Sequence, residues 1–80
     1  MDQYMNELME VLKAIRPEGD FANSKDFITD GLLDSFDVVT LVSALDKKYG
    51  ISIQGEDILP ENFQNVEAID ALLQKSGVKR

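Results

Sequence analysis

Apolar residues between Ser35 and Tyr49 recur every three or four positions, a spacing that predicts an amphipathic helix. The face expected to join a core comprises Val38, Leu41, Val42, Leu45 and Tyr49. A different face carries Phe36, Val39 and Ser43. Because the helical period separates these three side chains from the first set, we expect them to lie at the surface.

Both ends of this helix are marked in the sequence. Asp34 is the expected N-cap, and Asp37 three residues later has the spacing of a capping box. Gly50 fits the position that closes a helix, because glycine adopts the left-handed conformation at little steric cost. Ser35 is therefore predicted at the first helical position.

Two further helices are predicted on either side of this one. The first spans Asp2 to Ile15 and is closed by Pro17, and the last spans Val66 to Lys75 with Asn65 as its N-cap. Both carry apolar residues at helical spacing, so both are expected to pack against the central helix.

The segments between the helices differ in character. The long connection from Arg16 to Leu33 holds several large apolar residues, so we expect it to pack over the core. A short helical turn is predicted from Gly55 to Leu59, stopped by Pro60. Together these elements predict an all-α fold, a small bundle of three main helices plus one short helix.

Composition narrows the possible functions. The 80 residues are expected to form one domain, 1–80, with its core over about 2–76 and a tail over 77–80. A formal net charge of −7 argues against binding nucleic acid and favours basic partners. The chain has no histidine or cysteine, which excludes Ser–His and Cys–His pairs and the usual zinc sites. With no signal-peptide pattern or membrane-length apolar run, we expect a cytoplasmic protein without direct membrane insertion. We also expect the protein to be a monomer.

The segment Asp34-Ser35-Phe36-Asp37 resembles the Asp-Ser-Leu-Asp box of the acyl carrier protein and peptidyl carrier protein family. The resemblance runs from about Met5 to Ser76 and includes the apolar spacing after the box, the chain length and the acidity. It implies the carrier fold and a covalent 4'-phosphopantetheine on Ser35. It also implies a non-catalytic chain whose partners are a phosphopantetheinyl transferase and acyl- or aminoacyl-loading and transfer enzymes.

The residue types around Ser35 suit that chemistry. A serine at a helix start presents one hydroxyl in a fixed place, and the helix N-terminus favours the negative charge of a phosphate. We expect partner enzymes to dock on Asp34, Phe36, Asp37, Val39 and Ser43. The apolar side chains would supply affinity, and the acids would steer the encounter.

The departures from the family pattern bear on the pathway. Phe36 replaces the box leucine, Thr40 replaces an acid of fatty-acid carriers, and Lys47 and Lys48 replace another acidic pair. The chain therefore looks more like a specialised stand-alone carrier of polyketide, nonribosomal peptide or D-alanyl transfer pathways than like the carrier of fatty acid synthesis.

Two other interpretations stay open. Ser35 could be a plain helix cap in a non-modified acidic interaction module. A partial EF-hand calcium pattern is formed by Asp26, Asp30, Gly31, Asp34 and Asp37. Ile28 occupies its third ligand position, and Asp37 stands where a bidentate glutamate is usual, so we assign no metal-binding residue.

Overall fold

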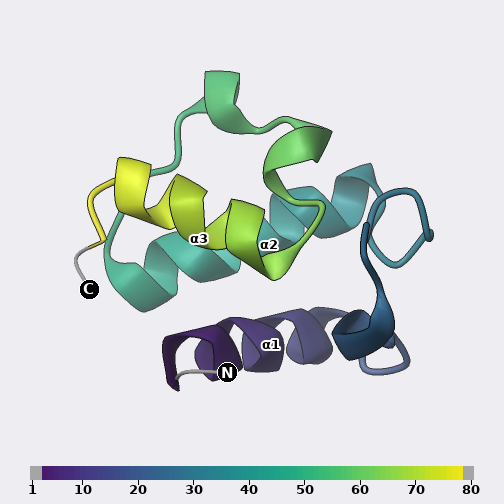
Figure 1. Cartoon of the computed structure of the whole chain (residues 1–80). Helices are drawn as coiled ribbons and strands as arrows, with labels where there is room; N and C mark the ends of the chain where they lie inside the picture. Colours follow the sequence, from purple (N-terminus) through teal and green to yellow (C-terminus); the bar gives the residue numbers. More distant parts are fainter. Residues whose placement is uncertain (1–2, 79–80) are drawn as a thin grey trace.

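The computed structural model describes residues 3–78, apart from the side chain of Tyr4. Three α-helices form the body of the molecule: α1 (Gln3–Ile15), α2 (Ser35–Tyr49) and α3 (Val66–Lys75) (Figure 1). The connections contain three 3₁₀ turns: η1 (Phe21–Asn23), η2 (Gly55–Asp57) and η3 (Pro60–Asn62). Residues 3–78 contain no strand, which confirms the predicted all-α class. Asp2, the predicted start of the first helix, and the last two residues of the predicted tail lie outside the described residues.

The helix ends follow the predicted chemistry. The N–H of Asp37 donates to Oδ1 of Asp34 at 2.9 Å, and the N–H of Asp34 donates to Oδ2 of Asp37 at 3.2 Å. Asn65 caps α3 by accepting from the N–H of Ala68 at 2.7 Å. Gly50 closes α2 with a φ of 64°, in the left-handed region. Because these caps are local, α2 begins at the predicted residue, Ser35.

The core lies where α1 packs against both α2 and α3 (Figure 1). The predicted stripe of α2 is buried at Val38, Leu41, Val42 and Leu45. Tyr49 is only half-buried, and its hydroxyl donates to Oε1 of Glu7 on α1 at 3.3 Å. Each large apolar side chain that is fully buried contributes about 1.5–3 kcal/mol by leaving water.

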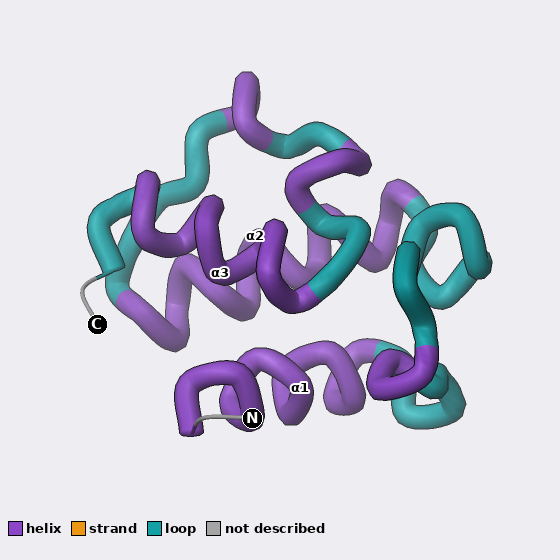
Figure 2. Tube along the Cα trace, viewed as in Figure 1, coloured by secondary structure: helices purple, strands orange, loops and turns teal. Residues whose placement is uncertain are grey.

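The connection from Arg16 to Leu33 packs over the core, as predicted. Figure 2 shows it as loop apart from the turn η1. Phe21 and Phe27 are buried in an edge-to-face pair with ring centroids 5.0 Å apart. The N–H of Phe27 donates to the carbonyl of Gln64 at 2.7 Å, which ties the connection to the segment before α3. The chain is thereby anchored before it enters α2.

The segment between α2 and α3 differs from the prediction in detail. The turn expected at Gly55 is present but ends at Asp57. Pro60 does not stop a turn; it begins η3, because its fixed φ and missing N–H suit the first helical position. Neither the second turn here nor η1 was predicted. Residues 51–53, between α2 and η2, belong to neither a helix nor a strand.

Candidate attachment site

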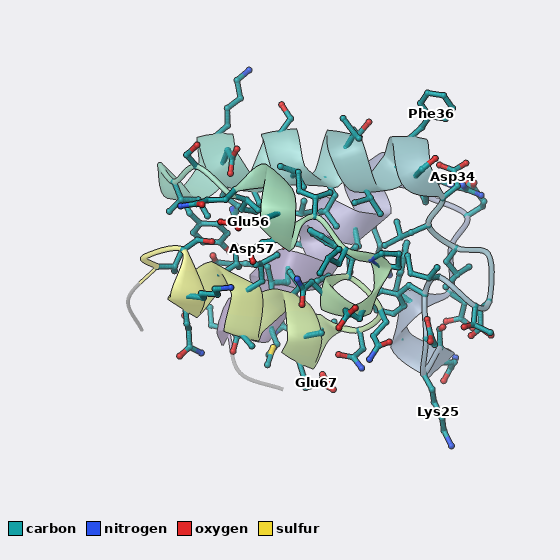
Figure 3. All side chains as sticks on the ribbon, turned by 90° about the horizontal axis from the view of Figure 1, so that it is seen from above. Lys25, Asp34, Phe36, Glu56, Asp57 and Glu67 are labelled. Carbon is teal, nitrogen blue, oxygen red and sulfur yellow. The ribbon has the colours of Figure 1, made fainter. Side chains whose placement is uncertain are left out.

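Ser35 is exposed at the first position of α2. Its hydroxyl makes no hydrogen bond with any other part of residues 3–78. The neighbours Asp34 and Phe36 lie at the same end of α2, and the Phe36 ring points away from the body of the molecule (Figure 3). The site therefore presents an accessible hydroxyl on a backbone that a capping box holds in place.

Asp37 forms a partly buried ion pair within the protein. Its side chain is only 17% exposed, and its Oδ2 lies 2.8 Å from Nη1 of Arg16. Partial burial raises the pKa of Asp37, but hydrogen bonds from the N–H of Asp34 and from Arg16 outweigh it, so the pKa is lower than usual. The carboxylate stays ionised and engaged at neutral pH. The docking role of Asp37 remains a prediction, whereas its structural role is observed.

An apolar cleft of about 280 Å³ opens beside Ser35, between α2 and the segment that holds η2 and η3. It is lined by Ile28, Leu33, Asp34, Ser35, Val38, Val39, Ile58 and Pro60. All but two of these side chains are apolar, so the cleft suits a hydrophobic group better than a charged one. Ile58 and Pro60 were not predicted as part of this site, because only the tertiary fold brings them to the cleft beside Ser35.

The expected surface placement of the second face of α2 is confirmed. Phe36 is 82% exposed and Val39 is 62% exposed, and Ser43 is also at the surface. Leu59 is a further exposed apolar residue, at 42%, that was not predicted. Phe36 and Val39 stand three positions apart on one face of α2, and apolar side chains that are exposed together are typical of a contact surface. Their docking role itself remains a prediction.

The acidic side chains of the partial calcium pattern accept hydrogen bonds from different donors. Asp26 accepts from the N–H groups of Ile28 and Thr29 at 3.0 and 3.1 Å, and these bonds close a turn. Asp30 accepts from the hydroxyl of Ser24, and Asp37 binds Arg16. Within residues 3–78 no group of three or more acidic side chains is arranged to hold a metal ion.

Residues 5–73 match the family model of the phosphopantetheine attachment site. The match spans most of the chain, so the chain belongs to the family of phosphopantetheine-binding carrier domains, whose cofactor is covalently attached 4'-phosphopantetheine. Carrier domains of this family are in general non-catalytic. No curated protein and no solved structure gave a significant match. None of the described helices is long and apolar enough to cross a membrane.

The residues at the start of α2 fit the cofactor. Ser35 offers an accessible hydroxyl without an internal partner, and the helix N-terminus favours a phosphate. The cleft alongside offers apolar surface within the same site. Arg16 was not predicted as part of this site, because it contacts Asp37 from 21 positions away and no local sequence pattern marks it.

Proposed function

We propose that Ser35 carries the phosphopantetheine arm and that the chain is a single carrier domain for thioester-bound cargo. The observation that carries this proposal is the exposed Ser35 hydroxyl at the capped start of α2, inside the Asp34-to-Asp37 box. A plain helix cap would be Asp34, which already fills that role, so Ser35 is not needed for capping.

The modification is a phosphoryl-type transfer from coenzyme A. The Ser35 oxygen forms a bond to phosphorus, the pyrophosphate bond breaks, and adenosine 3',5'-bisphosphate leaves. The hydroxyl proton passes to a base on the transferase. This chain holds the hydroxyl in place and favours the phosphodiester charge through the N-terminus of α2. Once attached, the arm supplies a terminal thiol for thioester formation.

The cleft beside Ser35 favours an apolar acyl cargo over an aminoacyl cargo. An acyl chain gains free energy when it leaves water for a lining such as Ile28, Val39 and Ile58. A charged amino group would lose hydration against this apolar lining, in which Asp34 is the single carboxylate. Among the pathways left open, those that handle apolar acyl groups therefore agree best with the site.

Partner enzymes would dock on the exposed face of α2 beside the arm. Phe36 and Val39 provide apolar contact area, and Ser43 extends the same face. Asp34 adds an exposed acid at the rim, which suits basic groups on the transferase and on loading enzymes. The chain contributes the surface and the attachment point, and the docked enzymes contribute catalysis.

The experiment is an intact-mass measurement after incubation with coenzyme A, magnesium and a broad-specificity phosphopantetheinyl transferase. The wild-type protein should gain the mass of one phosphopantetheine, and Ser35→Ala should gain none. Ser52→Ala is the matched control, because Ser52 is an exposed serine that lies outside α2 and outside the proposed docking face. It should react like the wild type. An unreactive wild type would instead favour the non-modified interaction module.

A further inference from the structure

Arg16 connects the end of α1 to the start of α2. Its N–H donates to the carbonyl of Leu12 at 2.9 Å, and its own carbonyl accepts from the N–H of Gly19 at 3.0 Å. A Cβ on Gly19 would come within 2.7 Å of the Phe21 ring, so this turn packs closely against the core. The backbone that carries the Arg16 side chain is therefore fixed on both sides.

The guanidinium of Arg16 bridges two carboxylates. Nη1 donates to Oδ2 of Asp37 at 2.8 Å, and Nε donates to Oε1 of Glu18 at 2.8 Å. The Arg16 side chain is 32% exposed and that of Asp37 is 17% exposed, whereas Glu18 is 68% exposed. The contact with Asp37 is thus the better shielded of the two, and shielded charge-assisted bonds are stronger than surface ones.

The Asp37 carboxylate, which Arg16 holds, also binds the backbone of the turn that carries Ser35. The Oδ2 atom that contacts Arg16 also accepts from the N–H of Asp34 at 3.2 Å. In return, Oδ1 of Asp34 accepts from the N–H of Asp37 at 2.9 Å. Ser35 lies between these two residues in the chain. Movement of the Asp37 carboxylate therefore changes the hydrogen bond from the N–H of Asp34, which is one half of the capping box around Ser35.

We propose that Arg16 is a positioning residue for the modification of Ser35. Arg16 acts through Asp37 by orienting its carboxylate. It also balances the negative charge of that carboxylate near Ser35, where the phosphodiester would form. Phosphoryl transfer requires the attacking oxygen in a narrow range of positions, so a loosened turn lowers the rate even in a folded protein. The inference rests on the proposed function of Ser35.

The first test compares transferase kinetics for Arg16→Ala, Arg16→Lys and Lys13→Ala. Lys13 is an exposed base in the last turn of α1, so its loss changes net charge equally without touching Asp37. Arg16→Ala should lower kcat/KM about fivefold or more, as expected for a partly buried charged contact. Arg16→Lys should recover only part of the loss, because one ammonium nitrogen cannot replace the two guanidinium nitrogens that bind Asp37 and Glu18. Lys13→Ala should stay near wild type.

A double-mutant cycle with Asp37→Asn then tests the route of the effect. If Arg16 acts through Asp37, then Arg16→Ala should lower the rate little further in the Asp37→Asn background. Losses that multiply, or an Arg16→Ala variant with wild-type kinetics, would overturn the proposal.

Amide hydrogen exchange separates positioning from a general loss of fold. In Arg16→Ala the amide of Asp34, which donates to the carboxylate that Arg16 contacts, should exchange faster, while the core amide of Leu45 should keep its protection. Equal loss of protection at both amides would indicate a merely structural role and would reject this inference. Failure of the wild type to be modified would reject the proposed function, whereas unchanged exchange at the Asp34 amide in the variant would reject the Arg16 inference alone.

Discussion

Phe36 and Val38 stand two positions apart in α2 but lie on opposite sides of it, with 82% and 7% of their surfaces exposed. Val38 belongs to the core, and Phe36 lies at the surface next to Ser35. An aromatic side chain held so far into solvent adds little to the stability of the isolated domain. If Phe36 binds partner enzymes, as proposed, its substitution should affect loading much more than folding.

Phe36→Ala should weaken loading of the holo protein by its cognate enzyme. The free energy of unfolding should change by no more than about 0.5 kcal/mol, because the side chain is exposed. Leu41→Ala is the contrasting control and should cost about 2–5 kcal/mol, because Leu41 is fully buried. Chemical denaturation and loading kinetics measure both quantities. A strongly destabilised Phe36→Ala protein would argue against a docking role.

An octanoyl group on the arm should enter the cleft beside Ser35, whereas an acetyl group is too short to fill it. The methyl resonances of Ile28, Val39 and Ile58 should shift more for the octanoyl form, while that of Ile69, outside the cleft, should not. Ile58→Glu should abolish the difference by placing a charge in the cleft. Leu59→Glu, at the neighbouring exposed position, should preserve it. Identical spectra for both acyl forms of the wild type would exclude an apolar cargo site here.

Asp37 should contribute to the acid stability of the protein. Hydrogen bonds from Asp34 and Arg16 outweigh burial and lower its folded pKa, so its stabilisation is present above the unfolded value of about 3.9. That contribution is lost as the pH falls through the lower, folded pKa. The stability gap between wild type and Asp37→Asn should therefore shrink below about pH 4. Acid unfolding followed by circular dichroism checks this, and a gap that stays constant down to pH 2 would contradict it.

Calcium should find no tight stoichiometric site. Asp26, Asp30 and Asp37 already accept hydrogen bonds from three different parts of the chain, and Ile28 interrupts the ligand pattern. Calorimetry at physiological ionic strength should show only weak, salt-sensitive association with this acidic protein. A submicromolar site that Asp30→Ala removes would instead support the calcium-sensor interpretation.

Local signals in the sequence predicted α2 to the residue. The apolar period, the capping box and Gly50 all act within a few positions, so they are visible without the fold. The exposed position of Phe36 followed from the same period.

Features that depend on distant segments could not be predicted in the same way. The bond from Arg16 to Asp37 joins residues 21 positions apart, and Ile58 reaches the cleft only through packing. The bond from Arg16 to Asp37 also makes Asp37→Lys a poor test of docking. Asp37→Lys would break the capping box and the ion pair, so a loss of loading in that variant would not isolate docking.

Localising the added mass by fragment-ion mass spectrometry is the most direct test of the central claim. After reaction with coenzyme A and a phosphopantetheinyl transferase, the fragments should place one phosphopantetheine on Ser35. The other exposed serines, Ser43 and Ser52, should remain unmodified. Modification at either of those serines, or a wild-type protein that stays unmodified with several transferases, would contradict the assignment of Ser35 as the attachment site.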